Sequence, residues 1–469
     1  MEFKILLYLI NMLLGTNYFE FDDASEFSEG MAAVTRKGKW GYIDTSGRLI
    51  IQFKYDFASE FSGGTAVVQS GGKWGYISHD DSKLTQFVFT EATSLINKIG
   101  IVKYKGHFGI VDHSGKILGK IQYDEISPFR NNRAIVRRYG RYGFIDTNGT
   151  IIGKIKYDYA WDFTGSFARV ELNGKFGFID KHGKSLKNLF FTNAYDFSDN
   201  AAPVEINGKW GYINSSGDII GKIKYDKVTS FNEARGGVIL NNNYGFIDKY
   251  GTEVIHPKYD FSKQFSSGLA HVILKNKHAL IDKWGNTVTK FLYDEIADYS
   301  EGMVRFKTGK RYGFLDIHGK EIIKPKFDYA FDFSEGLAGV FLKNKWGFIN
   351  KKGAIVIKFQ FDRIHSFQSG FARVAKRTHF LDWGFSSKSG KFLGKFQWVY
   401  DFKNHRARVM LNGKYGFVNK LIQLITAVEF DSAYDFKDNF ALVKRKGKWS
   451  FVNKSGKYLS IKQLKNKIK

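Results

Sequence analysis

The chain has 469 residues, and its 72 Lys and Arg against 46 Asp and Glu give a formal net charge of +26 at pH 7. Hydrophobic residues make up 43% and aromatic residues 17%, so the composition excludes a disordered polyelectrolyte and indicates a large aromatic core. Cysteine is absent, which excludes disulfides, thiol nucleophiles and cysteine-based metal sites. No apolar run reaches the ~20 residues that a membrane-spanning helix needs.

The first 17 residues lie outside the pattern that organises the rest of the chain. Ile5–Leu14 is an uncharged, apolar run with the length of a signal-peptide core, which spans ~7–15 residues. Leu6 also lies 34 residues before Trp40. Residues 1–17 are therefore interpreted as a signal peptide or as a degenerate half-repeat. The first alternative predicts a secreted or cell-envelope protein, and the second a cytoplasmic one.

Residues 18–456 form one tandem array, followed by a basic tail at 457–469. An aromatic-glycine dipeptide, or its counterpart, recurs every 34 residues from Trp40 to Trp346, and then at intervals of 37, 32 and 34 residues. Such a period is typical of repeat architectures, so about thirteen repeats replace the three ~150-residue domains that length alone suggests. The anchors are Trp40, Trp74, Phe108, Tyr142, Phe176, Trp210, Tyr244, His278, Tyr312, Trp346, Trp383, Tyr415 and Trp449.

The decapeptides GKWGYIDTSG (38–47) and GKWGYINSSG (208–217) resemble the WG, or KWG, repeat family of bacterial proteins. The resemblance extends over most of the chain and recurs in register. It implies a β-rich tandem-repeat domain, and it brings no catalytic residue, cofactor or metal with it.

Within one repeat, the pattern predicts a three-stranded antiparallel meander. In the first repeat the strands are Ala32–Val34, the segment around Trp40 and Leu49–Phe53, and both faces of the middle strand are apolar. Lys37-Gly38 is typical of a two-residue type I′ hairpin, and Asp44 with Gly47 of a type I turn. The following segment, 55–61, is predicted to be a compact return loop or single helical turn that plugs the core.

The arrangement of the repeats is predicted to be an open, superhelical β array, or solenoid. Thirty-four residues are few for a four-stranded propeller blade, and thirteen repeats exceed the ~8 blades of an ordinary propeller. The alternative is a pair of propeller-like rings joined near the irregular spacing between Trp346 and Tyr415. Repeats 2, 8, 11 and 12 depart from the consensus, and the departures mark either function or repeat decay.

No catalytic constellation emerges, so a non-enzymatic protein is expected. One position of the repeat holds an aspartate in most repeats, and in the first repeat it is Asp56. Because this aspartate recurs with the repeat, it is expected to accept backbone hydrogen bonds in a turn. The eleven histidines form no recognised metal spacing. Nucleotide-binding, hydrolase and zinc-protease motifs are absent from the sequence.

Cations occupy two regular slots. Lys or Arg precedes the anchor in ten repeats, and a second row runs through Lys54, Lys156, Lys224, Lys258 and Lys326. Isolated solvated charges, or lysines that deter edge pairing, account for these rows. A cluster of five arginines does not fit that account, because two of them face each other across a predicted tight turn. The predicted polyanion-binding residues are Arg130, Arg133, Arg137, Arg138 and Arg141.

Two functional hypotheses follow. The first is a repeat scaffold whose cationic surface binds an acidic polysaccharide, anionic lipid, acidic protein or nucleic acid. The second is a protein–protein interaction module that uses exposed aromatic side chains, with the charge serving solubility.

Overall fold

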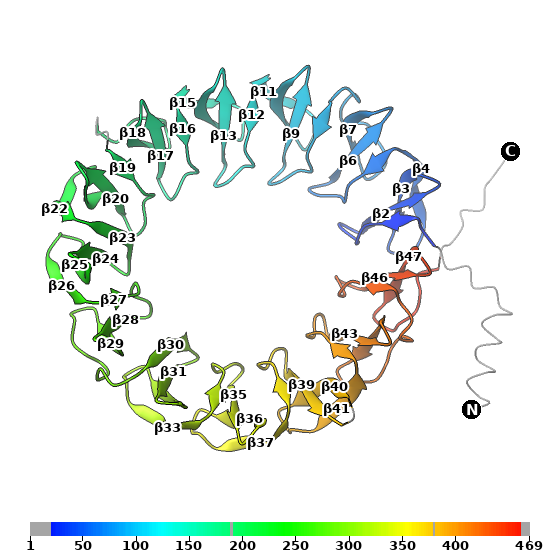
Figure 1. Cartoon of the computed structure of the whole chain (residues 1–469). Helices are drawn as coiled ribbons and strands as arrows, with labels where there is room; N and C mark the ends of the chain where they lie inside the picture. The colour runs from blue at the N-terminus through cyan, green and yellow to red at the C-terminus, as the bar shows by residue number, and fades with distance from the viewer. Residues whose placement is uncertain (1–19, 188–190, 379, 461–469) are drawn as a thin grey trace, which may run out of the picture. The chain divides into compact units, whose positions relative to one another are not determined.

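The computed structural model describes residues 20–187, 191–378 and 380–460 (Figure 1). Within these ranges every regular element is a β-strand, and the strands form thirteen antiparallel sheets, one for each repeat. The all-β fold and the tandem repeats are therefore confirmed. By its internal contacts the chain divides into two compact units, which are described separately. Unit 1 comprises the described residues up to 122, 368–387 and from 391, and unit 2 comprises those of 123–367 with 388–390.

Each repeat contributes strands in a fixed order, which is also their order in the sheet. The first strand is short: β1 (Asp23–Ala24), β5 (Phe57–Ala58), β8 (Glu91–Ala92), β12 (Glu125–Ile126), β16 (Tyr159–Ala160), β19 (Asn193–Ala194), β23 (Lys227–Asn232), β27 (Phe261–Ser262), β30 (Glu295–Ser300), β34 (Tyr329–Ala330), β38 (Arg363–Ile364), β42 (Trp398–Val399) and β45 (Ser432–Ala433). The second is β2 (Met31–Arg36), β6 (Thr65–Ser70), β9 (Ile99–Tyr104), β13 (Arg133–Arg138), β17 (Phe167–Leu172), β20 (Ala201–Ile206), β24 (Arg235–Leu240), β28 (Leu269–Leu274), β31 (Met303–Thr308), β35 (Leu337–Leu342), β39 (Phe371–Arg377), β43 (Arg406–Leu411) and β46 (Phe440–Arg445).

The third strand carries the anchor: β3 (Lys39–Asp44), β7 (Lys73–Ser78), β10 (His107–Asp112), β14 (Arg141–Asp146), β18 (Lys175–Asp180), β21 (Lys209–Asn214), β25 (Asn243–Asp248), β29 (Lys277–Asp282), β32 (Arg311–Asp316), β36 (Lys345–Asn350), β40 (Leu381–Ser387), β44 (Lys414–Asn419) and β47 (Lys448–Asn453). The fourth is regular in eight repeats: β4 (Leu49–Tyr55), β11 (Ile117–Tyr123), β15 (Ile151–Tyr157), β22 (Ile219–Tyr225), β26 (Glu253–Tyr259), β33 (Glu321–Phe327), β37 (Ile355–Phe361) and β41 (Phe392–Phe396).

The anchor strand is sandwiched between two cores, as its doubly apolar pattern predicts. In β3, Tyr42 belongs to a core shared with repeat 2, whereas Ile43 belongs to a core shared with repeat 13. The glycine between Trp40 and Tyr42 is required by close packing, because a Cβ on Gly41 would lie 2.5 Å from the carbonyl oxygen of Ile51. Each repeat therefore buries both of its faces only when its neighbours are present.

The predicted three-stranded meander is corrected to a four-stranded sheet in most repeats. The segment expected to form a return loop or helical turn instead begins with a short strand, such as β5, which pairs with β6. The amides of Asp56 and Ser59 donate to carbonyls of Gln69 and Val67. Because this pairing satisfies the backbone of the segment, no helical turn is needed. The repeats are thus propeller-type blades, which agrees with the propeller alternative and not with the solenoid.

Repeats 2, 8 and 12, singled out as irregular, share a structural device. Their fourth strand is replaced by isolated bridges, and a threonine hydroxyl on this segment accepts a hydrogen bond from the anchor strand. The pairs are the Tyr76 amide with Thr85, the Leu280 amide with Thr289 and the Phe417 amide with Thr426, at 2.8–3.0 Å. These repeats are therefore a second, specified blade type. In repeat 11, the extended hairpin includes His379, which lies outside the described residues.

The two ends of the array meet within unit 1. Phe21 and Trp449 exchange two backbone hydrogen bonds of 2.9 and 3.0 Å, and the Lys448 ammonium pairs with Asp22 at 2.5 Å (Figure 1). Trp40 and Tyr55 form the corresponding pair in repeat 1. The open array predicted from the sequence is therefore wrong at its termini, because Phe21 and Asp22 supply repeat 13 with the counterparts of Tyr55 and Asp56.

The boundaries predicted at the two ends fall differently. Residues 1–17, assigned to a signal peptide or half-repeat, lie outside the described residues. Tyr458 and Leu459, assigned to the basic tail, pack with partly buried side chains against the cores that flank repeat 13. Among the described residues there is no helix that is long and apolar enough to cross a membrane.

Candidate functional site

The predicted arginine cluster lies in repeat 4, within unit 2, and centres on the hairpin between β13 and β14. Tyr139 and Gly140 form its two-residue turn with φ of 50° and 74°, as a type I′ turn requires. Arg138 and Arg141 are directly paired across the two strands. The opposition of two arginines expected from the sequence therefore occurs.

Carboxylates from adjacent segments neutralise three of the five arginines. Arg137 pairs with Glu125 at 2.6 Å and Arg130 with Asp162 at 3.4 Å. Arg141 also forms an ion pair, with Asp158. The sequence alone does not indicate these partners, since they come from the short strand β12 and from loops that follow in the chain.

The other two arginines lie against aromatic rings. The Arg138 guanidinium lies 4.9 Å from the centre of the Tyr139 ring, and that of Arg133 lies 4.6 Å from the Phe163 ring. Within the described residues neither arginine has a carboxylate in ion-pairing range, and the Nε atom of each is buried without a hydrogen-bond partner. These two side chains therefore hold the uncompensated charge of the cluster.

Tyr139 is the most unusual residue of the hairpin. Tyr139 is 82% exposed. Its backbone is left-handed, and other repeats place Lys, Asn or Gly at the same turn position. The left-handed backbone is common to this turn position, since Lys37, Asn173 and Lys343 share it, so the exposed aromatic ring is what distinguishes Tyr139.

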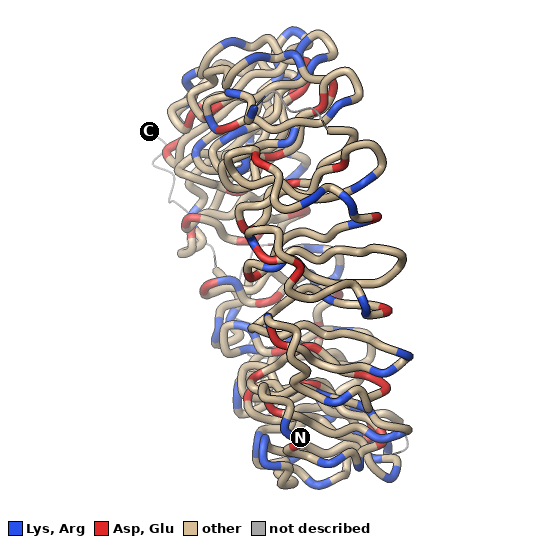
Figure 2. Tube along the Cα trace, turned by 90° about the vertical axis from the view of Figure 1, so that its left-hand side faces the viewer, with Lys and Arg blue, Asp and Glu red and all other residues tan. Residues whose placement is uncertain are grey.

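The cations that precede the anchors do not form a free stripe. Eight of them pair with a carboxylate of the consensus aspartate slot, which in the array lies 17 residues further on, and basic and acidic segments accordingly adjoin in Figure 2. The pairs are Lys39–Asp56, Arg141–Asp158, Lys209–Asp226, Lys277–Asp294, Arg311–Asp328, Lys345–Asp362, Lys414–Asp431 and Lys448–Asp22.

The same aspartates also accept backbone hydrogen bonds from the next repeat. Asp56 binds the Lys39 ammonium with Oδ1 and the Gly71 amide, at the hairpin of repeat 2, with Oδ2. Lys39 first, and then the Gly71 amide, lower the pKa of Asp56. The structural role predicted for this slot is confirmed, and the slot also joins consecutive repeats.

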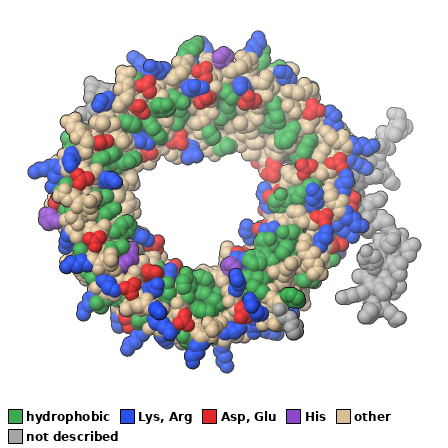
Figure 3. Space-filling model, in the orientation of Figure 1, with side chains coloured by type: hydrophobic (Ala, Val, Ile, Leu, Met, Phe, Trp, Pro, Cys, Tyr) green, Lys and Arg blue, Asp and Glu red, His purple; other side chains and the backbone are tan. Residues whose placement is uncertain are grey.

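The lysines of the second cationic row lie against aromatic side chains. Each ammonium of Lys54, Lys156, Lys224, Lys258 and Lys326 lies 5.1–5.4 Å from the centre of the aromatic ring that follows it in sequence. On the face shown in Figure 3, basic and acidic side chains are interspersed. The net charge of the chain is thus spread over many small sites.

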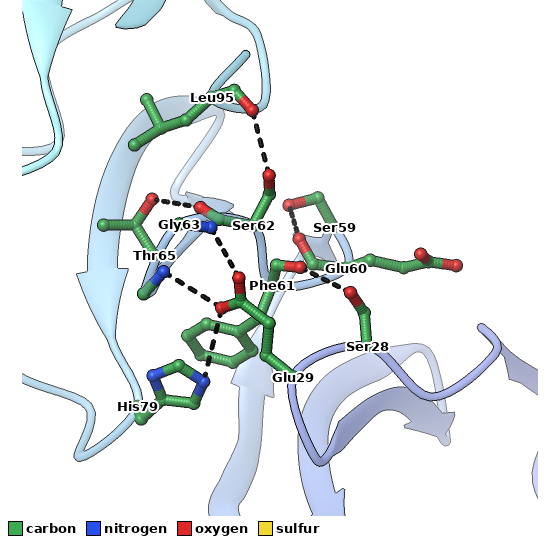
Figure 4. A network of polar contacts seen from close by, with 11 residues as sticks. Ser28, Glu29, Ser59, Glu60, Phe61, Ser62, Gly63, Thr65, His79 and Leu95 are labelled. Atoms are coloured by element: carbon green, nitrogen blue, oxygen red, sulfur yellow. Dashed lines mark hydrogen bonds and ion pairs between the residues drawn. The ribbon is translucent and has the colours of Figure 1, made fainter. Parts of the chain in front are cut away.

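A polar network between consecutive repeats was missed by the sequence analysis. In unit 1 the Glu29 carboxylate accepts the amides of Gly63 and Gly64 at 2.7 and 2.9 Å, and the Ser28 hydroxyl donates to the Phe61 carbonyl (Figure 4). Glu233 and Glu301 repeat this arrangement in unit 2. A Ser-Glu-Gly signal recurs in the sequence, but its partners lie one repeat away.

Repeat 8 replaces Trp-Gly with His278-Ala279 and pairs two histidines. The His271 Nε2 and His278 Nδ1 atoms lie 2.9 Å apart and the rings are stacked. Burial, followed by the neighbouring His278, lowers the pKa of His271 to about 4, and burial lowers that of His278. The two rings are therefore neutral at pH 7 and add no charge to the surface. In the described ranges, no group of three or more metal-ligating side chains is found.

Two further aromatic side chains are strongly exposed in unit 2. Tyr250 and Trp284 are 74% and 72% exposed, and they occupy the same turn position of consecutive repeats. Large exposed aromatic side chains of this kind are typical of interaction surfaces.

Comparison with solved structures finds distant likenesses. The extracellular domain of the one-component system BT4673 from B. thetaiotaomicron is 10% identical, with 96% of this chain and 78% of that chain covered and a TM-score of 0.19. A eukaryotic initiation factor is 13% identical, with 63% and 95% covered and a TM-score of 0.30. Hsv2p of Kluyveromyces lactis is 12% identical, with 46% and 88% covered and a TM-score of 0.26. At these TM-scores the likenesses carry no functional argument.

No curated protein matches the chain. A family model described as "WG containing repeat" matches twelve times, and its matches begin and end close to the anchor residues of the repeats. They cover residues 18–40, 40–74, 108–142, 142–176, 176–210, 210–244, 244–277, 280–312, 312–346, 346–377, 383–415 and 415–449. The chain therefore belongs to the family of proteins built from WG-containing repeats.

Proposed function

We propose that this protein is a non-enzymatic repeat scaffold that binds an acidic partner, and that the β13–β14 hairpin is the centre of the binding surface. The observation that carries the proposal is the pairing of Arg138 with Arg141 beside the exposed, left-handed Tyr139. Like charges placed directly opposite each other are destabilising. Asp158 already neutralises Arg141, so the charge that is left for an anionic group is that of Arg138, and arginine is well suited to bind such a group.

The partner is an acidic polysaccharide, anionic lipid, acidic protein or nucleic acid. Arg138 and Tyr139 contact it first, because Arg138 is the arginine at the turn without a carboxylate partner in the described residues. Arg130, Arg137 and Arg141 share their charge with Asp or Glu and contribute less. The net charge of +26 raises the rate of encounter with any acidic surface. A location outside the cytoplasm belongs to the same proposal and rests on the apolar run Ile5–Leu14.

The test compares two triple variants against heparin and a single-stranded DNA oligonucleotide over a range of salt concentrations. Replacing Arg137, Arg138 and Arg141 with Ser should weaken binding and flatten the slope of log K against log salt by about one unit, because Arg137 and Arg141 are already paired with carboxylates and Arg138 makes the main contact. The matched control replaces Lys209, Lys277 and Lys345 with Ser. It removes equal charge from sites that also hold ion pairs. Equal weakening by both variants, or no binding by the wild type at physiological salt, would overturn the proposal.

A second candidate function is protein–protein interaction through exposed aromatic side chains. It is favoured by Tyr250 and Trp284, because their exposure repeats at one turn position in consecutive repeats. Binding of this kind changes little with salt. A partner whose affinity is insensitive to salt and is lost when Tyr250 and Trp284 are replaced with Ser would favour this second function over the first.

A further inference from the structure

A pocket of about 420 Å³ lies in unit 2, where the turns of repeats 4 and 5 meet. Its lining includes Arg133 from repeat 4 and Lys181 and His182 from repeat 5. The pocket is therefore a second basic feature, separate from the Arg138 hairpin. Arg133 begins β13, and Arg138 of the proposed binding hairpin ends it. The two residues are five positions apart on the strand, or about 17 Å, and an odd offset places their side chains on opposite faces.

The equivalent place is closed in two other pairs of repeats. The Arg235 Nε atom donates to the Lys283 carbonyl at 2.9 Å, and the Arg406 guanidinium donates twice to the Lys454 carbonyl at 2.8 and 3.0 Å. Both arginines occupy the slot of Arg133, and both carbonyls belong to the turn of the next repeat. In both of these repeats, the arginine of this slot therefore seals one turn onto the next.

Arg133 does not make this seal. Its guanidinium turns to the Phe163 ring and donates to the Asn131 carbonyl at 3.1 Å, and its Nε atom is buried without a partner. The Lys181 side chain is exposed, and within the described residues no carboxylate lies in ion-pairing range of it. The pocket thus holds two cations without a carboxylate partner and a buried donor.

The same position between repeats 13 and 1, in unit 1, is also hollow, and its one lining cation is Lys454, at a different position from those of Arg133 and Lys181. There Phe440 takes the slot of Arg133 and Thr45 that of Lys181. A hollow at this position is therefore a common product of the fold. The pair of cations is what distinguishes the pocket of repeats 4 and 5.

The remaining walls are suited to a sugar ring. Asn131, Asn132 and Thr147 offer hydrogen-bonding groups, and Ile151 and Ile152 offer an apolar surface. Asp146 also lines the pocket, but its Oδ1 atom is already bonded to two backbone amides of its own turn. Its second oxygen is left to accept a hydroxyl. A volume of this size falls within the range of small-ligand sites.

We propose that this pocket binds one acidic monosaccharide unit, with Arg133 and Lys181 holding its carboxylate or phosphate group. The asparagines and Asp146 bind hydroxyl groups, and the isoleucines contact the apolar face of the ring. The proposal rests on the proposed function, since it names an acidic glycan as the partner. Arg133 and Arg138 lie on opposite faces of β13, so the pocket and the Arg138 hairpin contact separate parts of that glycan.

The test measures binding of glucuronate, glucose 6-phosphate, glucose and inorganic phosphate to the full chain by calorimetry and NMR. Glucuronate or glucose 6-phosphate should bind more tightly than glucose and than inorganic phosphate, and the two acidic sugars distinguish a uronate from a phosphate source. Arg133→Gln should weaken that binding roughly tenfold to a hundredfold, since a charge-assisted hydrogen bond is lost. Lys181→Gln provides a second variant at an exposed position where folding is not at risk.

The matched control is Arg235→Gln, which changes the same slot where the arginine seals a turn. The proposed binding site would be overturned by an equal loss of acidic-sugar affinity in Arg133→Gln and Arg235→Gln. An affinity for glucose equal to that for the acidic sugars, or no binding of either acidic sugar, would also overturn it. Inorganic phosphate binding as tightly as glucose 6-phosphate would overturn the recognition of a sugar. Heparin affinity that depends on the Arg138 hairpin while no acidic sugar binds would refute this inference alone and leave the proposed function intact.

Discussion

The closure of the array by its N-terminal segment leads to a sharp stability prediction for Phe21. This side chain is 1% exposed and packs in a core formed by repeats 1 and 13, where it lies edge-on to Phe451. Replacing a buried Phe with Ala costs about 3–5 kcal/mol. Phe21→Ala should therefore loosen the Phe21 edge of β47, and increase the opening of the backbone hydrogen bonds there on the order of 10² to 10⁴-fold.

Hydrogen exchange followed by mass spectrometry is the suitable assay, because it reports local opening without requiring the whole array to unfold in one step. Protection should fall at Trp449 and Phe451 and stay unchanged at repeats far along the chain. The matched control is Phe89→Ala in the same unit. Phe89 is 3% exposed and forms the same two-bond bridge with an anchor, Trp74, inside the array. The control should open β7 and leave β47 protected. Unchanged protection at Trp449 in Phe21→Ala would refute the closure by this segment.

Three other predictions follow. Asp56 has a lowered pKa in the folded protein, so the stability that it contributes is present above the unfolded pKa of about 4 and is lost as pH falls below it. Urea unfolding should therefore show a deficit of Asp56→Asn at pH 7 that shrinks at pH 3, whereas a constant deficit would contradict this. Gly211→Val should cost about 1–3 kcal/mol, because even a Cβ would lie 2.5 Å from the Ile223 Cδ1 atom and 2.9 Å from a backbone oxygen; a thermal melt equal to wild type would show that the glycine is incidental. If a signal peptide is removed, mass spectrometry should find a mature N-terminus no later than Phe21, since this residue completes repeat 13, whereas an intact Met1 would exclude cleavage.

The long strands could be predicted because their signals are local. The apolar run Gly41-Tyr42-Ile43 and the turn glycines lie within one repeat and depend on its own backbone. The 34-residue period then shows that the same signals return in each repeat. The short first strand could not be predicted in this way. Its partners come from the following hairpin, and two residues are too few to show a period.

The candidate site shows the same limit. The sequence correctly placed Arg138 opposite Arg141, because a two-residue turn fixes the register of its hairpin. It did not show that Glu125 and Asp158 neutralise neighbouring arginines, nor that Arg133 leaves a turn unsealed. Those facts depend on contacts between different segments and repeats. The 34-residue period alone does not show which side chains meet there.

The inter-repeat contacts also explain why a basic repeat protein can offer a confined binding site. Where a cation meets the aspartate slot, as Lys209 meets Asp226, its charge is used to join one repeat to the next. A cation is available to a ligand only where that partner is missing or where the side chain turns away. Arg138 and Arg133 satisfy this condition at opposite ends of one strand. Under the proposed function, specificity depends on local departures from the repeat and not on the sum of its charges, so substitutions at Arg133 and Arg138 should outweigh equal charge changes elsewhere.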